Sequence, residues 1–350
     1  MCRGLGVIEG VDNTVLYGVA GAGLFVLILA ISAISMHLNR QRAVSDERQV
    51  YKLRRKRAAR YEDAKKDYEK YRKKIESGNT VLVDLIHDLG DDFVGRDSAQ
   101  QQIAFDEAFE AVASIRQANP RARIVIVLHT LGGYARPAHM IALAIKQHLS
   151  KGKGHYNPRR EPRVVAYVPY VAMSGGTMIA LAADKIVMDP TASLGPIDTI
   201  YGGFPTEAYK ELLAQKGPLA TQDVLVMLAH EAEKYDRYAG QVARDIVNDI
   251  HKAEGKPDHH IADTLSAGTL SHSQAITPGD AKGFGMNVST KIPDLIYGLV
   301  DARIRMIHTR LEYEARRLDS EDAGEEGGTD NAEQAIERAI RQSLRGNVRL

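Results

Sequence analysis

The 350-residue sequence contains one cysteine, Cys2, which excludes an internal disulfide and any metal site built from several cysteines. This scarcity fits a reducing compartment. The phosphate-binding pattern GxxxxGK[ST] is also missing, which excludes a nucleotide site of that class. The net charge is only +1, but the charged residues are distributed unevenly along the chain.

Charged residues are missing from residues 15–36, which read VLYGVAGAGLFVLILAISAISM. A helix of this length, at about 1.5 Å per residue, can cross a hydrocarbon core of about 30 Å. The flank that follows is rich in arginine and lysine, and positive charge stays on the cytoplasmic side. We therefore predict an uncleaved single-pass anchor in the cell inner membrane, with the N-terminus outside and the body of the protein cytoplasmic. The alternative is a buried core helix.

Glycine and proline are missing from residues 39–77, where basic residues outnumber acidic ones about two to one. This pattern predicts a continuous helix that leaves the membrane with lysine and arginine near lipid headgroups. Nucleic acid is the alternative partner for the run RRKRAAR, but a basic stretch beside a membrane needs no such partner, and we expect none. The predicted parts are a short extracytoplasmic leader (1–12), a transmembrane helix (13–38) and a basic helical stalk (39–78). A globular domain (79–300), a C-terminal helix (301–318) and an acidic flexible linker with a short terminal helix (319–350) are predicted to follow.

Short runs rich in β-branched residues alternate with amphipathic runs after residue 79. Such alternation with short links predicts right-handed crossovers and a parallel sheet, so the expected fold class is α/β. The predicted strands lie at residues 81–87, 123–129, 163–168 and 185–188, and the predicted helices at residues 99–118, 135–149 and 222–253. A shorter helix is expected to start at Thr277, with Pro278 in its first turn.

Two glycine-containing segments, VLHTLGGYA and AMSGGT, each lie where a predicted strand gives way to a helix. Ligands bind at the carboxyl ends of parallel strands, and glycines let backbone amides approach a ligand. An acyl-transfer enzyme needs a nucleophile and two N–H donors aimed at the developing oxyanion. Ser174 is the candidate nucleophile, and the amides of Gly133 and Gly175 are the candidate oxyanion hole. In the alternative interpretation, Ser174 only caps the helix that follows.

The segments HTLGG and VPYVAMSGGTMIALAADKIVMDPTASLGPID resemble the serine dehydrogenase proteinase family. This family belongs to the ClpP/crotonase superfamily and is related to signal peptide peptidase A. The resemblance covers about residues 81–300. It implies a parallel-sheet spiral of ββα units and a serine peptidase, with Ser174 as nucleophile and Gly133 and Gly175 as oxyanion hole. Leu131 departs from the family pattern, which usually has proline at this position.

The group that would activate Ser174 is not a nearby histidine, because none occurs between His155 and His230. The Clp protease subunit has its histidine on the segment that matches TASLGPID, which here holds none. This favours a serine–lysine dyad of the signal peptide peptidase A type, with a desolvated lysine as base. Lys216 and Lys234 are both candidates, and Lys185 and Lys210 are weaker ones.

We interpret Asp198, in the loop LGPID, as structural or substrate-orienting. The spacing of His259, His260 and His272 does not indicate a metal site, and we expect no cofactor.

The sequence thus predicts a membrane-anchored serine peptidase that self-associates and cleaves peptides or membrane-protein fragments. One alternative is a crotonase-like acyl-CoA enzyme, in which the paired amides act without a serine nucleophile. The other is a non-catalytic membrane scaffold.

Overall fold

In the computed structural model, the described residues are 13–89, 102–151, 162–197, 199–201, 204–251, 255, 260–268, 270–271 and 273–325. Side chains are not described for residues 13–30, 43, 46–47, 201 and 314–325. The chain divides into two compact units, residues 1–60 and 61–350. The predicted leader, residues 326–350 of the tail predicted from residue 319, and Asp198, His259 and His272 lie outside the described residues.

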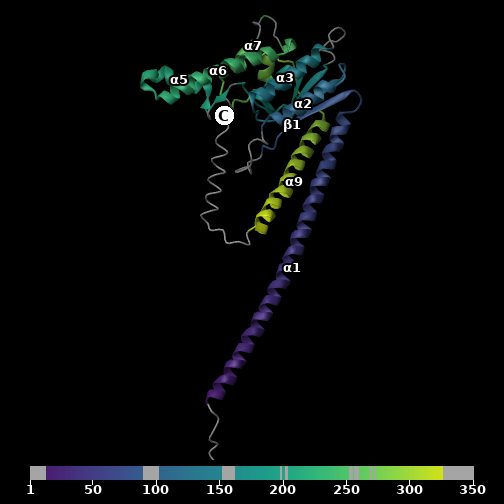
Figure 1. The fold of residues 1–350 in the computed structure, drawn as a ribbon. Helices are drawn as coiled ribbons and strands as arrows, with labels where there is room; N and C mark the ends of the chain where they lie inside the picture. The colour runs from purple at the N-terminus through teal and green to yellow at the C-terminus, as the bar shows by residue number, and fades with distance from the viewer. Residues whose placement is uncertain are drawn as a thin grey trace, which may run out of the picture. The chain divides into compact units, whose positions relative to one another are not determined.

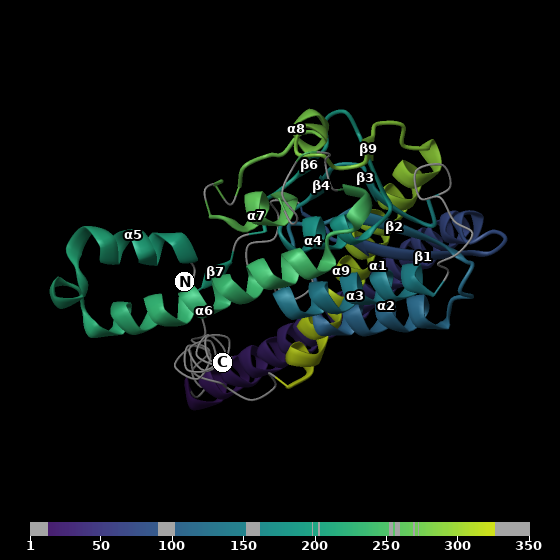
Figure 2. The same ribbon diagram turned by 90° about the horizontal axis from the view of Figure 1, so that it is seen from above.

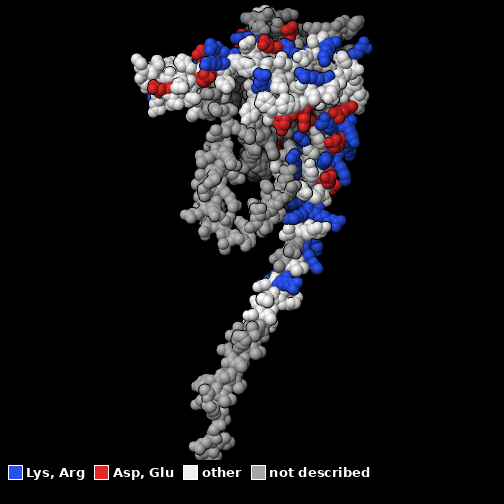
Figure 3. Space-filling model, in the orientation of Figure 1, with Lys and Arg blue, Asp and Glu red and all other residues white. Residues whose placement is uncertain are grey.

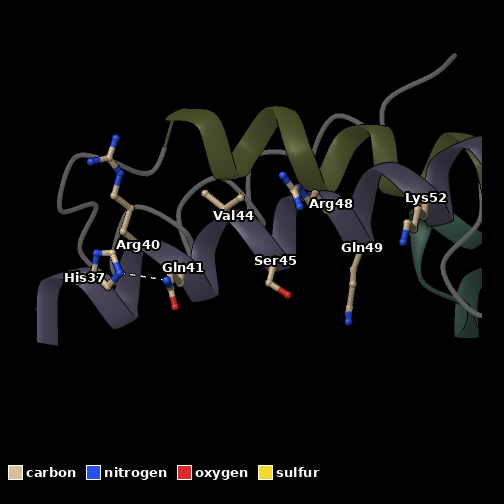
Figure 4. Close-up of a pocket in the computed structure, with 8 residues that line it drawn as sticks. All are labelled: His37, Arg40, Gln41, Val44, Ser45, Arg48, Gln49 and Lys52. Carbon is tan, nitrogen blue, oxygen red and sulfur yellow. Dashed lines mark hydrogen bonds between the residues drawn. The ribbon is translucent and has the colours of Figure 1, made fainter. Parts of the chain in front are cut away.

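Helix α1 spans Asn13–Ile75, so its residues belong partly to the first unit and partly to the second (Figure 1). Lysine and arginine side chains gather along this helix (Figure 3). A groove on α1 includes His37 and Gln41, which share a hydrogen bond of 3.0 Å (Figure 4). Eight side chains line it: His37, Arg40, Gln41, Val44, Ser45, Arg48, Gln49 and Lys52.

A helix able to cross a membrane is not found among the described residues, which are the only ones searched. Much of the predicted anchor falls on residues 15–30, whose side chains are not described. The transmembrane prediction therefore gains no support from the structure.

The second unit is built on a five-stranded, fully parallel sheet in the order β1-β2-β3-β5-β9. The strands are Thr80–Ile86, Arg123–His129, Val164–Val168, Lys185–Met188 and Val288–Ser289. The α/β class and the parallel sheet are confirmed, and β9 was not predicted. Two small sheets accompany the main one: β4 (Val171–Ala172) pairs with β6 (Ser193–Leu194), and β7 (Ile200–Tyr201) with β8 (Phe204–Pro205).

Both faces of the main sheet are covered, which explains why its strands are almost uniformly apolar. In β2, Ile124 and Ile126 pack into the larger core, whereas Val125 and Val127 pack into the smaller one. The larger core contains residues of α2 (Phe105–Gln117), α3 (Ala135–Ser150), α4 (Gly175–Ala182), α6 (Asp223–Ile246) and α7 (His260–Ser266). The smaller core is formed with the end of α1 and with α9 (Asp294–Glu325).

A buried polar link joins the end of α1 to β1. The Tyr68 hydroxyl donates to the Asp84 carboxylate at 2.7 Å, and Arg72 lies 3.5 Å from the same carboxylate. Burial, followed by the charge of Asp84, raises the pKa of Tyr68, so its hydroxyl keeps the proton it donates.

Helix α5 (Thr206–Lys216) and the first half of α6 form a hairpin that extends from the unit (Figure 2). They are joined by the short helix η3 (Pro218–Ala220). The predicted end of the long helix near residue 253 is wrong, because α6 ends at Ile246. The N–H of Asn248 instead donates to the carbonyl of Leu181, and η4 (Asp249–His251) follows.

Helix α8 (Pro278–Gly283) starts as the sequence predicts. Thr277 and Asp280 form a reciprocal capping box, with Pro278 in the first turn. The predicted boundary between residues 300 and 301 falls inside α9.

His251 makes the folded protein sensitive to acid. Its buried ring lies 2.8 Å from the carbonyl of Ala183 through Nε2, and its Nδ1 accepts the N–H of Asn287 at 3.0 Å. This arrangement requires a neutral ring, and burial lowers the pKa of His251 to about 4. Below its ordinary pKa of 6.5 the unfolded chain binds a proton that the folded chain does not. The free energy of unfolding should therefore fall by about 3 kcal/mol as pH drops from 6.5 to 4.

Urea unfolding between pH 8 and 4 measures this loss. His251→Asn should flatten the acid slope, whereas His230→Asn, at an exposed histidine, should keep it. An identical slope in the His251 variant and the wild type would refute the assignment.

Candidate active site

Ser174 occupies a strained position between β4 and α4. Its φ of 47° and ψ of −113° make it the one residue other than glycine with positive φ among those that the structure describes. Such a conformation costs about 1–3 kcal/mol and persists only where the surroundings enforce it. Ser174 is the N-cap residue of α4, yet its hydroxyl makes no capping hydrogen bond. The capping alternative therefore does not account for this serine.

The segment before Ser174 is held by Thr130, which follows β2. The Thr130 N–H donates to the carbonyl of Val171 at 3.0 Å, and the N–H of Met173 donates back to the Thr130 carbonyl at 3.0 Å. On the other side, the buried Thr177 hydroxyl lies 2.8 Å from the carbonyls of Ala172 and Gly195. These contacts fix the backbone on both sides of the strained residue.

Gly132 and Gly133 form the second turn of the site, which we call the glycine corner. The Ile103 N–H donates to the Gly132 carbonyl at 2.8 Å, and the Tyr134 N–H donates to the Ile103 carbonyl at 3.0 Å. These two bonds leave the N–H of Gly133, which lies between them, directed away from Ile103. A Cβ on Gly133 would lie 2.3 Å from the Ile103 nitrogen, so only glycine fits there.

The glycine corner lies directly against Ser174. A Cβ on Gly132 would come within 2.9 Å of the Ser174 Cβ, and a Cβ on Gly175 would lie 3.7 Å from the Gly133 nitrogen. Among the described residues, the amides of Gly133 and Gly175 have no acceptor. The structure thus brings together three of the five predicted site residues: the hydroxyl of Ser174 and the two amides.

The two candidate lysines form no hydrogen bond or ion pair with Ser174 or the glycine corner in the part of the chain that the structure describes. Lys216 is exposed at the end of α5, and Lys234, on α6, is 60% exposed and pairs with Glu231 at 2.5 Å. Within the described part of the chain, no hydrogen bond joins either lysine to Ser174. Burial lowers the pKa of Lys210, but its bonds to Asp236 and Glu207 outweigh this effect and raise it. Lys210 is thus held as a charged ion pair.

His129, the last residue of β2, is close to the glycine corner in sequence but lies on the other face of the sheet. Strand alternation places its side chain with those of Val125 and Val127 in the layer of α9. Its ring contacts Tyr170, which in turn contacts Tyr297 of α9. Burial lowers the pKa of His129 to about 4. His129 therefore supports the α9 layer and not the serine.

Sequence reasoning missed Thr130 and Thr177, the two buried hydroxyls that hold the corner and the serine segment. The signal was a threonine directly after an apolar strand and another three residues after the serine, but threonine is common at such places. No group of histidine, cysteine, aspartate and glutamate side chains suited to a metal ion occurs within the described residues.

The family model for ClpP-like SDH-type serine proteinases matches residues 60–314. Two uncharacterized proteins of Methanocaldococcus jannaschii are 34% and 30% identical to this chain over 199 residues, which is 57% of its length. The matched part spans 65% and 63% of those two relatives, less than two thirds of each.

Two solved structures of the 1510-N membrane-bound stomatin-specific protease are more distant. One of them holds a substrate peptide. They are 19% and 18% identical, cover 62% and 63% of this chain and 78% and 83% of their own, and have TM-scores of 0.37 and 0.35.

Proposed function

This chain belongs to the ClpP-like SDH-type serine proteinase family, and from that membership we propose that it is a peptidase with Ser174 as its nucleophile. The single observation that carries the proposal is the strained Ser174, whose Cβ lies against the glycine corner and whose hydroxyl, like the amides of Gly133 and Gly175, has no hydrogen-bond partner among the described residues. A residue kept in a costly conformation without a capping role is typical of a reactive position.

The proposed reaction follows from this arrangement. The Ser174 oxygen attacks the carbonyl carbon of the substrate and loses its proton to a base. The carbonyl oxygen becomes an oxyanion, which the N–H groups of Gly133 and Gly175 stabilise. The C–N bond then breaks, and the amine leaves with the proton from the base. Water attacks the acyl-serine in a second step, which releases the acid product and restores the hydroxyl.

The base in this proposal is a lysine, either Lys216 or Lys234. An amine accepts a proton near neutral pH only where desolvation keeps it uncharged. Both lysines are exposed in the single chain, so this role requires further burial of the hairpin of α5 and α6. We include self-association in the proposal because it would provide such burial.

Membrane attachment completes the proposal. The charge-free residues 15–36 and the basic helix after them support a single-pass inner-membrane anchor with a cytoplasmic peptidase domain. Peptides or membrane-protein fragments are the proposed substrates. Contact of the arginines and lysines of α1 with anionic lipid headgroups is part of the same proposal.

Labelling with a fluorophosphonate tests the nucleophile. The wild-type full-length chain should be labelled on the tryptic peptide that contains Ser174, and Ser174→Ala should not be labelled. Ser273→Ala, at an exposed serine, is the matched control and should label like the wild type. Failure of the wild type to react, or labelling at another serine, would refute the proposal. Acyl-CoA turnover that survives in Ser174→Ala would instead support the crotonase-like alternative.

Substitution of the two lysines identifies the base. One of Lys216→Met and Lys234→Met should lower peptide turnover by about 10²–10⁴-fold, since a general base contributes this much, while the other should stay near the wild type. Arginine at the critical position should not restore activity, because a guanidinium does not release its proton. Peptide hydrolysis rates measure both effects. Normal turnover in both methionine variants would eliminate the serine–lysine dyad.

A further inference from the structure

A buried chain of hydrogen bonds leads from helix α2 to the glycine corner. Glu107 on α2 lies 3.1 Å from Nε2 of His87, the residue that follows β1. Nδ1 of His87 lies 2.8 Å from the Thr130 hydroxyl oxygen, which accepts the N–H of Gly132 at 3.0 Å. His87 is 2% exposed and Thr130 is fully buried, so neither can exchange these partners for water.

The Glu107 carboxylate determines which atoms donate and which accept along this series of hydrogen bonds. A carboxylate only accepts, so Nε2 of His87 carries a proton and donates it. In the tautomer that carries its proton on Nε2 alone, Nδ1 is an acceptor and takes the hydroxyl proton of Thr130, whose oxygen also lies 3.2 Å from the Gly132 carbonyl. The Thr130 oxygen is left to accept from Gly132. Every donor along the chain therefore points toward the carboxylate, and such aligned bonds strengthen one another.

Thr130 connects this chain to both halves of the site. Its side chain holds Gly132, while its main chain holds Val171 and Met173 next to the serine. Its methyl group is packed so closely that a Cβ on Gly176 would lie 2.7 Å from it. A shift of Thr130 would thus move the Gly133 amide relative to Ser174. Displacements of about 1 Å in a catalytic arrangement lower rates by about 10²-fold.

We propose that His87 is a positioning residue, which fixes Thr130 and thereby aims the Gly133 amide at the oxyanion. The proposal rests on the proposed function of Ser174. It differs from the dyad because the ring of His87 bonds to Glu107 and Thr130, so His87 would act through Thr130.

Two pairs of variants test the proposal in the full-length chain. His87→Leu and Thr130→Val remove the link, whereas His87→Asn retains a polar group at the position of Nδ1 and Thr130→Ser retains the hydroxyl. The matched control is His148→Leu, because His148 is also 2% exposed but bonds to the Ala122 carbonyl just before β2, at the opposite end of this strand from Thr130.

The two disrupting variants should lower kcat by about 10–100-fold and leave KM within about threefold, because they weaken transition-state and not ground-state binding. Thr130→Ser keeps the hydroxyl but loses the packed methyl group, so Thr130→Ser and His87→Asn should each recover most of kcat. The double variant His87→Leu/Thr130→Val should be no slower than the slower single variant, because both remove the same link. His148→Leu should lower Tm without lowering kcat.

Amide hydrogen exchange provides a readout that does not need activity. The Gly132 amide should exchange faster in His87→Leu than in the wild type and in His148→Leu. A folded His87→Leu variant with normal kcat and normal Gly132 exchange would overturn the proposal. It would also be overturned if kcat in His148→Leu fell equally, or if only KM changed. If the wild type lacked turnover that depends on Ser174, the proposed function would fail, and the exchange measurement would still decide whether His87 holds the corner.

Discussion

Replacing Ser174 with alanine is expected to lower peptide turnover by about 10⁴–10⁶-fold, the range found when the nucleophile of a serine protease is removed. Alanine fits at this position, since the substitution only removes the oxygen, and within the described part of the chain the hydroxyl has no hydrogen-bond partner. Thermal unfolding should therefore change little. The Tm of Ser174→Ala should exceed that of the wild type only if the hydroxyl itself contributes to the strain at φ 47°. Hydrolysis of casein or of a fluorogenic peptide by the full-length chain measures the loss.

Two comparisons make this result specific. Ser273→Ala should keep full turnover, because Ser273 is exposed and distant in sequence from both the glycine corner and Ser174. Substrate should still bind to Ser174→Ala, because the two amides are unaffected. Residual turnover above about 1% of the wild type would contradict the role of Ser174, since the oxyanion hole alone supports far less. Loss of folding in the variant would contradict the claim that the hydroxyl has no structural role.

The sequence predicted the main sheet well because its physical signal is local. In β2 the run RIVIVLH is apolar at every interior position, and both of its faces are buried in the structure. Burial on both faces is the property that distinguishes a strand of a parallel sheet from a half-exposed one. Strand β9 has only two residues, Val288 and Ser289, and pairs with β5 over the same length. Two residues are too few to show the pattern of apolar residues by which a strand is recognised in a sequence.

Part of the candidate site could also be predicted, because the positions that follow strands are visible in the local sequence pattern. Ser174, Gly133 and Gly175 each follow a strand, and the carboxyl ends of parallel strands meet at one edge of the sheet. The two candidate bases, Lys216 and Lys234, lie on a helical hairpin whose distance from the sheet does not depend on local sequence pattern. A lysine at the end of a helix has the same sequence signature whether it is exposed, like Lys216, or buried by another chain.

The hydrogen-bond chain from Glu107 to Gly132 could not be predicted either. It joins residues 20, 43 and 2 positions apart along the chain, and only the last of its links lies within one short segment. The one local hint was His87, a polar residue at the end of an apolar strand. A histidine at such a position is usually solvated, and its burial follows from the packing of α2 against β1.

Gly133→Ala is expected to lower kcat by about 10²–10³-fold, the cost of one misplaced oxyanion donor, and to destabilise the protein as well. The added Cβ would lie 2.3 Å from the nitrogen and 2.4 Å from the oxygen of Ile103. The Ile103 nitrogen already donates to Gly132 and its oxygen already accepts from Tyr134, and Ile103 is fully buried, so the two segments must separate. Kinetics with a fluorogenic peptide and thermal unfolding measure the two effects. Gly283→Ala, where no atom lies within 4 Å of the added Cβ, should leave both unchanged or raise Tm slightly.

The nature of the clash predicts which second substitution can relieve it. At Gly133 the clash involves backbone atoms, so shortening the side chain in Ile103→Val should not restore activity to Gly133→Ala. At Gly176 the added Cβ would instead meet the Thr130 methyl group at 2.7 Å, and the next contact is at 3.3 Å. Thr130→Ser removes that methyl group and keeps the hydroxyl, so it should restore much of the activity lost in Gly176→Ala. If Ile103→Val rescued Gly133→Ala, the Gly133 amide would not be held by the backbone of Ile103, and the oxyanion hole would have to be built from other donors.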